Sequence, residues 1–538
     1  NIAGATIKSE GTASITAGRD VNLSTKKLHS QKDMTADGDN YLRTSRDTEM
    51  NTEIQAQGNL TVSAGQDVNA KAAFMGSQNG DIAIRAGNNI NLQAGKEASH
   101  DKYSLKHTES GLLSSTTTLT RTDDEHETIL GTGLSGQNIT LAAGNAIHTE
   151  AAQIAADNNV DMSAKEITLN SAAQYDRDQN EKQVEESGLL ANGFGILLGT
   201  RETKDTASDK YLTQQGTAIG AGGSVTVQGS DHVQITSSEI VANKGIEISA
   251  PTVTVNGKEN VHESVIRHEE SQTGLTVGLG GSTVSVIESV AQPLKRAVRV
   301  KDDRLKALYA WRAGRNAREN REALQNIGKG KLDIGLNVGI GTSHSESQTV
   351  TTEREYAGSN IAAQKDVNLQ ATENNLVITG SKVTGKNINL EAKEDIVLQA
   401  GQNTIHTDVT ENSSSTGISA GYSFGAGFGS IGVSHNSSGL NGQGDAITYQ
   451  GTNIKASDVL TTKSGKDTEI IGSTATGNKV DMTVDGNLHI ETLQDVDNYH
   501  ETSHSNGFSI DMTKGLRPDF GISASRVNMD SDYASTTK

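Results

Sequence analysis

The chain has 538 residues and a composition with 57 Gly, 3 Pro, only 3% aromatic residues and no Cys. Without Cys, disulfides, thiolate metal sites and cysteine nucleophiles are excluded. The net charge of −19 argues against general nucleic-acid binding, and we expect no nucleic-acid partner. No apolar run is long enough to predict a transmembrane helix. The sequence starts at Asn1 without a signal peptide and stops within a pattern at Lys538, so we expect a longer parent protein.

An imperfect repeat of roughly 20 residues runs along the chain. Residues 17–23 read Ala-Gly-Arg-Asp-Val-Asn-Leu, and close copies follow at 64–70 and 86–92, which begin 22 residues apart. Shorter copies appear at 365–369 and 386–390. Within each copy apolar and polar side chains alternate, as in a strand with one buried face. Gly, Asn and Asp between the strands favour tight corners.

This pattern predicts an all-β fold, a right-handed parallel β-helix that forms one continuous array over residues 1–538. Stacked rungs would place Asn on Asn and Ile on Ile about 4.8 Å apart. Each rung buries little by itself, and stacking completes the core, which fits a sequence poor in large aromatics. The alternative is an antiparallel β-sandwich with coincidental internal similarity.

Several stretches interrupt the repeat, and we interpret them as β-hairpins that protrude from the rod or pack laterally on it. The predicted insertions cover about residues 100–136, 172–220, 259–357, 404–446 and 497–538.

The third, fourth and fifth insertions contain strands in which apolar residues alternate with Gly, Ser, Thr or Asn and, in the fifth, with Asp511. In the fourth, Ile418, Tyr422 and Phe424 share one face, whereas Ser419 and Gly421 share the other. One interpretation packs each apolar face against the flank of the rod. The other starts from the similarity of this alternation to a membrane-spanning β-strand. The candidate membrane-interacting residues are Leu275, Val277, Leu279, Ile334, Leu336, Val338, Ile340, Ile418, Tyr422, Phe424, Phe428, Phe508, Ile510, Phe520 and Ile522.

Within the third insertion, residues of about 289–327 lose the strand pattern and favour a short helix. Leu305, Leu308 and Trp311 mark a narrow apolar stripe among many basic residues. This segment could bind anionic lipid or lipopolysaccharide, or it could form a helical tip packed on its own hairpin. The candidate anionic-lipid contacts are Arg296, Arg299, Arg304, Arg312 and Arg315.

Motifs that suggest chemistry are weak. His500-Glu501-Thr502-Ser503-His504 matches the His-Glu-x-x-His pattern of zinc proteases, but its Ser- and Thr-rich surroundings do not favour the helix that such a site needs. The glycine-rich stretches do not precede a helix start, and no phosphate-binding loop is present. We therefore predict no enzyme activity, no catalytic residue, no metal ligand and no cofactor.

The repeat units at Ala17, Ala64 and Ala86 resemble the hemagglutinin repeats of filamentous-hemagglutinin-type exoproteins. The hairpin interruptions are similar to the second repeat block of contact-dependent growth inhibition exoproteins. This resemblance implies export through an outer-membrane two-partner-secretion transporter, a location in a filament at the bacterial cell surface, and a periplasmic stage before toxin delivery. It also implies a C-terminal toxin in the same chain and, as a partner, the outer membrane or lipopolysaccharide of a target cell.

Three functions remain open from the sequence. The first is a non-enzymatic segment that associates with the target outer membrane and helps a toxin to cross it. The second is an adhesin stalk that binds cell surfaces or glycans, with hairpins that only add rigidity. The third is a glycan-cleaving β-helix, which the lack of a recurring set of acidic residues disfavours.

Overall fold

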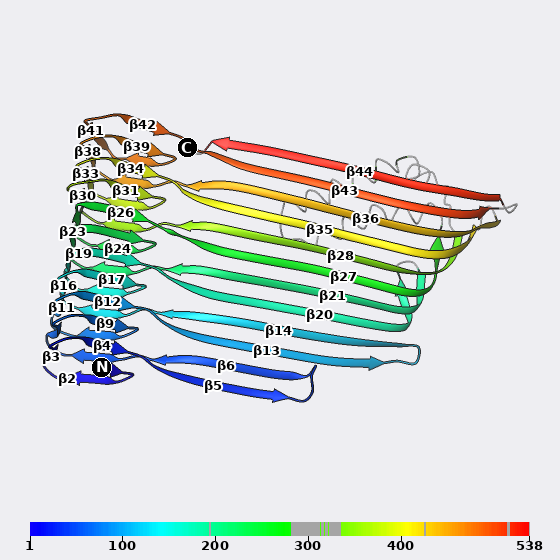
Figure 1. Ribbon diagram of the computed structural model, residues 1–538, viewed down its shortest axis with the longest axis horizontal. Coiled ribbons are helices and arrows are strands. Elements are labelled where there is room, and N and C mark those ends of the chain that lie inside the picture. The colour runs from blue at the N-terminus through cyan, green and yellow to red at the C-terminus, as the bar shows by residue number, and fades with distance from the viewer. Residues whose placement is uncertain are drawn as a thin grey trace.

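The computed structural model describes residues 1–192, 195–280, 335–423, 427–513 and 517–536, with the single residues 313, 317 and 321. Two regions are visible in Figure 1, a stack of short strands and a broad sheet of long strands that extends sideways from it. We call the stack the solenoid and the broad sheet the hairpin sheet. Among the described residues, no helix is long and apolar enough to cross a membrane.

The solenoid consists of three ladders of parallel strands. The first ladder contains β3 (Ala13–Ala17), β8 (Leu60–Ala64), β11 (Ile82–Ala86), β16 (Ile139–Ala143), β19 (Val160–Asn170), β23 (Val225–Thr236), β25 (Ile246–Ala250), β30 (Asp366–Ala371), β33 (Asn387–Ala392), β38 (Val459–Ser464) and β41 (Lys479–Val484). The second contains β1 (Ile2–Ala3), β4 (Val21–Ser24), β9 (Val68–Lys71), β12 (Asn89–Gln93), β17 (Ala146–Glu150), the later parts of β19 and β23, β26 (Thr252–Asn256), β31 (Leu376–Thr379), β34 (Ile396–Gln399), β39 (Thr468–Ile471) and β42 (Leu488–Glu491). The third contains β2 (Thr6–Ser9), β7 (Glu53–Ala56), β10 (Phe74–Ser77), β15 (Gly133–Gly136), β18 (Gln153–Ala156), β22 (Ala218–Ala221), β24 (Glu239–Ala242), β29 (Asn360–Ala363), β32 (Lys382–Gly385), β37 (Asn453–Ala456) and β40 (Thr474–Thr476).

The core lies inside the three ladders and is built from Ile, Leu, Val and Ala. Equivalent residues stack in register, so that Val68 lies opposite Ile90 and Asn69 opposite Asn91. The Asn91 side-chain amide donates to the Asn69 oxygen at 2.7 Å. Both the apolar and the Asn stacking confirm the rung arrangement predicted from the repeat, and the parallel β-helix is correct.

The hairpin sheet is one antiparallel sheet of twelve strands in the order β44-β43-β36-β35-β28-β27-β21-β20-β14-β13-β6-β5. Six hairpins supply it, each paired along its edges with the next (Figure 1). Their strands are β5 (Lys26–Thr35) and β6 (Tyr41–Met50), β13 (Gly95–Ser110) and β14 (Ser114–Leu130), β20 (Ala172–Asn192) and β21 (Gly195–Gln215), β27 (Lys258–Gly280) and β28 (Gly335–Ala357), β35 (Gly401–Ser423) and β36 (Gly427–Gln450), and β43 (Gln494–Thr513) and β44 (Arg517–Thr536). The first of these hairpins was not among the predicted insertions.

Every hairpin is inserted at the same corner of the solenoid, between the second and the third ladder, and in every second rung. The alternate rungs turn this corner through one residue with positive φ. These residues are Gly4, Ala72, Ala151, Ser237, Gly380 and Gly472. All three non-glycine residues with positive φ in the described chain lie at this corner, where stacking holds them in a conformation that costs an L-residue roughly 1 kcal/mol or more.

The alternation explains how separate hairpins form one continuous sheet. Rungs stack about 4.8 Å apart, and neighbouring strands of a sheet have the same spacing. A hairpin contributes two strands, about 9.6 Å of sheet width, and two rungs advance the solenoid by about 9.6 Å. Hairpins in every second rung therefore meet edge to edge without a gap or an overlap.

A buried hydroxyl closes the base of each of the first five hairpins. After the hairpin ends, Thr132 donates a hydrogen bond to the Gln93 carbonyl at 2.9 Å, across the whole hairpin β13–β14. Thr452 makes the same bond to Gln399 at 2.7 Å across β35–β36. The equivalent bonds elsewhere are Thr52 to Ser24, Thr217 to Asn170 and Ser359 to Asn256. This bond fixes the direction in which each of these hairpins leaves the rung.

Candidate functional site

The end of the hairpin sheet farthest from the solenoid carries a row of apolar residues that crosses eight strands. Residues directly opposite each other in a sheet share a face, so the pairing register defines the row. The first apolar row is Leu189, Leu198, Leu275, Ile340, Ile418, Val433, Ile510 and Phe520. The second apolar row, two residues farther out on the same face, is Ala191, Ile196, Val277, Val338, Ala420, Ile431, Met512 and Pro518.

Most of the large side chains of these rows are exposed to solvent, whereas Val277 and Ile510 are partly buried. Ile340 is 58% exposed, Ile418 52% and Phe520 68%, whereas the core residue Leu390 of the solenoid is fully buried. Soluble proteins rarely leave a contiguous apolar surface of this extent uncovered unless it serves an interaction. The hairpins thus protrude, and their apolar faces are not covered by the flank of the solenoid.

The structure brings most of the predicted membrane-interacting residues together. Of these, Leu275, Ile340, Ile418, Ile510 and Phe520 fall in the first apolar row, and Val277 and Val338 fall in the second. Two further pairs extend the same surface: Leu336 opposite Tyr422, and Phe508 opposite Ile522.

Other predicted residues fall outside the part of the chain that the structure describes. Ile334 and Phe424 lie outside the described residues, as does the predicted helical segment 289–327 with Arg296, Arg299, Arg304, Arg312 and Arg315, apart from the three single residues named above. Leu279 and Phe428 belong to β27 and β36, but their side chains are also outside the description.

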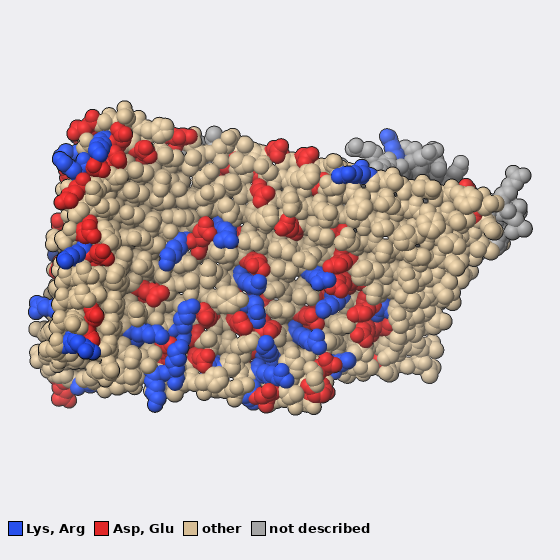
Figure 2. Space-filling model, in the orientation of Figure 1, with Lys and Arg blue, Asp and Glu red and all other residues tan. Residues whose placement is uncertain are grey.

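On six of the eight strands, β20, β21, β27, β28, β35 and β36, the apolar rows lie in parts that carry no charge. We call these the tip segments; they are residues 189–192, 195–198, 275–280, 335–340, 418–423 and 427–433, none of which is Asp, Glu, Lys, Arg or His. On β43 and β44, Asp511 and Asp519 lie between the residues of the rows, on the other face of the sheet. The face in view in Figure 2 shows the same division, with charged residues over the solenoid and the middle of the hairpin sheet and few at the distal end. An uncharged and exposed apolar surface suits contact with a hydrophobic partner.

Next to the tip segments, the opposite face of the sheet carries a row of glycines. This glycine row consists of Gly188, Gly199, Gly274, Gly341 and Gly417, each directly opposite the next. A Cβ on Gly199 would lie 2.1 Å from the Thr273 carbonyl oxygen, and Gly188 has a φ of +101°. Only glycine permits so close an approach of the strands. Figure 1 shows the distal ends of β20, β21 and β27 turning out of the line of their strands.

The sequence analysis missed several residues of the apolar rows. Leu189, Ile196 and Leu198 come from β20 and β21, where Leu190 and Leu197 are also apolar but buried on the other face. Apolar residues on both faces hide the alternation on which the prediction depended. The available signal was the pair of apolar runs on either side of Asn192-Gly193, a dipeptide typical of a hairpin turn.

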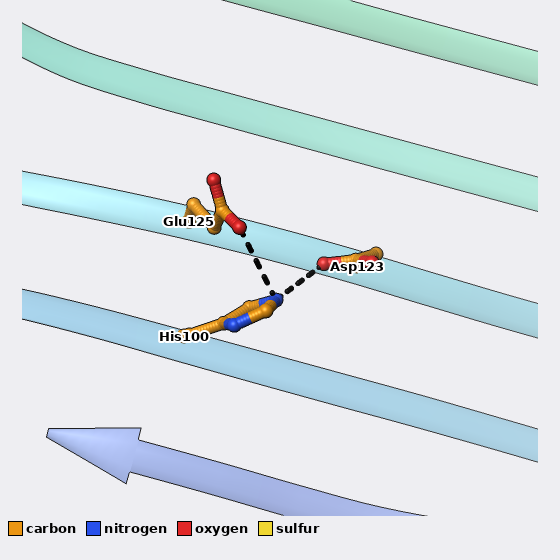
Figure 3. Close-up of side chains that lie close together, drawn as sticks. All are labelled: His100, Asp123 and Glu125. Atoms are coloured by element: carbon orange, nitrogen blue, oxygen red, sulfur yellow. Dashed lines mark hydrogen bonds and ion pairs between the residues drawn. The ribbon is translucent and has the colours of Figure 1, made fainter.

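The middle of the hairpin sheet is charged, and His100, Asp123 and Glu125 gather there on β13 and β14 (Figure 3). The His100 Nε2 atom lies 2.6 Å from Asp123 Oδ1 and 3.5 Å from Glu125 Oε1. Arg177 Nη2 reaches the same two carboxylate oxygens at 3.0 and 3.1 Å. Burial works to raise the pKa of Asp123, but hydrogen bonds with His100 and Lys102 and the charges of Lys102 and Arg177 hold it below its usual value. These cations already occupy the oxygens, so the cluster is better described as an ion-pair network that joins three strands than as a metal site.

Histidine–aspartate pairs recur across the same part of the sheet. His268 Nδ1 lies 2.6 Å from Asp205 Oδ1, and His406 Nδ1 lies 2.6 Å from Asp445 Oδ1. The hydrogen bond with Asp445 raises the pKa of His406, although burial opposes it, and the nearby Asp408 contributes further. These pairs connect neighbouring strands and stabilise their register.

The His-Glu-x-x-His motif lies in strand β43. Four residues of an extended strand span about 13 Å. His500 and His504 are therefore too far apart for both to bind one metal ion. His500 pairs with Asp530 of β44 instead. The geometry is not that of the helical zinc motif.

Comparison with protein families supports the interpretation of the repeat. The family model described as "Hemagglutinin repeat" matches residues 37–122, 113–196 and 340–507. The chain belongs to the hemagglutinin repeat family. The matched ranges include both solenoid rungs and hairpins, so the hairpins are part of the family's pattern.

This hemagglutinin-repeat chain is similar to segments of several much longer proteins. It is 28% identical to a "tRNA nuclease CdiA" of Yersinia mollaretii over 85% of this chain and 16% of that protein. It is 30% identical to a "16S rRNA endonuclease CdiA" of Enterobacter cloacae over 90% of this chain and 15% of that protein. A "Toxin CdiA" of Escherichia coli is 29% identical over 83% of this chain and 15% of that protein. No solved structure matches the chain.

Proposed function

We propose that this chain is a non-enzymatic filament segment of a secreted bacterial toxin-delivery exoprotein, located at the cell surface after export through a two-partner-secretion transporter. Its relatives are named as toxins and nucleases, and the chain spans about a sixth of their length. A toxin C-terminal to this segment in the same protein is the cargo, and the segment helps it to cross the outer membrane of the target cell.

The single observation that carries the membrane role is the exposed, uncharged apolar surface at the end of the hairpin sheet. Leu275, Ile340 and Ile418 lie side by side on three neighbouring strands and face solvent. A stalk that only needed rigidity would gain nothing from exposing them, because exposed apolar surface promotes aggregation. A hydrophobic partner such as the lipid of an outer membrane would cover them favourably.

The test is to place charges on this surface in the full-length exoprotein. The variant carries Ile340→Asp and Ile418→Asp, which are opposite each other on β28 and β35. A charged residue at the depth of the hydrocarbon costs about 2.5–3.5 kcal/mol, and each 1.4 kcal/mol is about a factor of ten in binding. We expect secretion and cell-surface display to be retained, and toxin entry into target cells to fall by at least about tenfold.

The matched control carries Gln348→Asp and Thr410→Asp. These residues are also opposite each other on β28 and β35 and on the same face, but they lie in the polar middle of the sheet. The control should deliver toxin normally. Normal delivery by the Ile340→Asp, Ile418→Asp variant would instead favour the adhesin stalk and remove the membrane role from this surface.

A further inference from the structure

If the proposed membrane role is correct, the geometry also says how the sheet meets the bilayer. We infer that the tip segments dock face-on, with the apolar rows buried in one leaflet and the glycine-row face turned to water, and do not span the membrane. The partner of this surface is the acyl-chain surface of a phospholipid leaflet. Three observations favour this mode over insertion of the hairpins end-on through the bilayer.

The first observation is the difference between the two faces of β28 and β35 at the same level of the sheet. On β28, Leu336, Val338 and Ile340 point to one face, whereas Asn337 and Gly339 point to the other. On β35, Ile418 and Tyr422 alternate with Ser419 and Gly421. On β20 and β21, by contrast, the other face carries Leu190 and Leu197, which are buried. A sheet that stands in hydrocarbon exposes both faces to lipid. A sheet that lies on a leaflet needs only one apolar face, as interfacial amphipathic helices do.

The second observation is that the sheet of tip segments has an open edge at β20. Strand β14 begins at Ser114, opposite Gly188, so among the described residues the part of β20 beyond Gly188 has only one strand beside it, apart from a single hydrogen bond from Leu189 to Leu113. Unpaired backbone groups are not tolerated in the hydrocarbon core, which is why spanning β-structures close into barrels. At the interface, water and headgroups can satisfy this edge.

The third observation is the order of polarity on the apolar face. On β21, β27, β28 and β35, a row of hydroxyl side chains lies two residues nearer to the solenoid than the first apolar row; it consists of Thr200, Thr273, Thr342 and Thr416. On β36, β43 and β44 the same row continues with His435, Phe508 and Ile522. Charged residues follow, with Lys204 opposite Glu269 and Glu269 opposite Glu346. Apolar, hydroxyl and charged groups succeed one another as the sheet rises from acyl chains through headgroups into water.

Two further features agree with this mode. The glycine row lies where the sheet passes from its charged part to the tip segments, so the tips can lie at an angle to the rest of the sheet. Insertion of β27–β28 end-on would also draw the segment 281–334, rich in Lys and Arg, into the hydrocarbon, at a cost of several kcal/mol for each charge. The apolar rows cross eight strands, which at about 4.8 Å between strands give a docking surface about 34 Å wide.

The chain has no Cys, so a single introduced cysteine can report the environment of one position. The 538-residue chain is prepared as Leu336→Cys or Asn337→Cys, two neighbours on opposite faces that are both exposed. Each is labelled with an environment-sensitive nitrobenzoxadiazole dye. The labelled chains are mixed with vesicles of phosphatidylethanolamine and phosphatidylglycerol, with a dye-labelled Asp161→Cys variant in the solenoid as control.

Face-on docking predicts a blue shift and brighter emission at position 336 and no change at 337 or 161. A blue shift at both 336 and 337 would show that the strands enter the bilayer with both faces, and would overturn the face-on mode while leaving the membrane role intact. The absence of a change at either position, with no co-flotation of the chain with vesicles, would overturn the membrane role itself and the face-on mode with it.

Discussion

The solenoid and the hairpin sheet are built from similar strands but place their apolar residues differently. In the solenoid, the Ile, Leu and Val of each rung point inward and stack on the rungs above and below. In the hairpin sheet, apolar residues of the tip segments form rows of the same kind, but solvent lies where the solenoid has its core. The same alternation of apolar and polar residues therefore builds a buried core in the solenoid. In the hairpin sheet it leaves an apolar surface that a partner can cover.

The two regions also differ in what determines their register. In the solenoid, each rung is positioned by the rung before it, and a Thr or Ser hydroxyl closes the corners that carry the first five hairpins. In the hairpin sheet, neighbouring hairpins come from rungs far apart in sequence, and their register depends on where the solenoid places their bases. The sheet is continuous because two strands of a hairpin and two rungs of the solenoid have the same width.

The strongest test of this dependence is to break the alternation. A second copy of residues 380–399, one rung without a hairpin, inserted directly after Gln399, would move β35 one rung away from β28. The pairing of β28 with β35 runs from Gly335 opposite Ser423 to Arg354 opposite Thr404. It could then no longer form in its present register. We expect the hairpin sheet to divide between β28 and β35 while the solenoid stays folded. Hydrogen–deuterium exchange should show lost protection in these two strands only.

A control insertion keeps the alternation. Duplication of residues 359–451 adds two rungs together with the hairpin β35–β36. In this variant all hairpins remain in every second rung, and β28 and β35 should stay protected. Equal protection of β28 and β35 in both variants would show that the hairpins find one another independently of rung spacing.

A smaller effect distinguishes buried from exposed apolar residues. Leu390 is fully buried in the solenoid, so Leu390→Ala should lower the free energy of unfolding by about 2–5 kcal/mol. Ile418 is half exposed, and Ile418→Ala should change it by less than about 0.5 kcal/mol. Urea unfolding followed by circular dichroism measures both. A loss at Ile418 as large as that at Leu390 would mean that the apolar rows are part of a core.

Much of the fold follows from the sequence because strand alternation and the repeat act locally. The Asn and Val of residues 64–70 and the equivalents in 86–92 predict stacked rungs, and the structure has them. The apolar and small residues of 418–423 predict a two-faced strand, which is also present. The hairpin β5–β6 was not predicted, because its exposed strands are polar and lack this alternation. The dipeptide Asp37-Gly38 between the strands was the available turn signal.

The assembly of the hairpins into one sheet could not be predicted from the strands themselves. Nothing in the sequence of β28 states that β35 will lie beside it, because that neighbour is selected by the spacing of rungs. A signal for the spacing was present at the corner. Gly precedes Thr or Ser at Thr132, Thr217, Ser359 and Thr452, all at the end of a hairpin. The rungs between have Ala72 or Ala151 at positive φ, a conformation that sequence rules assign to Gly.

The smallest predicted effect concerns a row of carboxylates on the face opposite to His100. Asp101, Asp124, Asp178 and Asp209 lie directly opposite one another on four neighbouring strands. Burial raises the pKa of Asp124, and the charges of Asp178, Asp123 and Asp101 raise it further. Like charges in this position destabilise a sheet by about 0.2–1 kcal/mol.

A carboxyl whose pKa is higher in the folded chain than in the unfolded chain favours folding when it is protonated. The contribution of Asp124 is therefore fully present below its unfolded value and is lost as the pH rises through its folded value. Asp124→Asn should raise the protection of β14 and β20 against hydrogen exchange at neutral pH, by up to about 1 kcal/mol. The gain should disappear in acid, where the wild-type carboxyl is also neutral. Asp161→Asn in the solenoid, where Thr140 and Thr226 lie opposite, is the control and should have no such pH-dependent gain. A gain at Asp124 that persisted unchanged in acid would mean that its charge does not oppose the pairing of these strands.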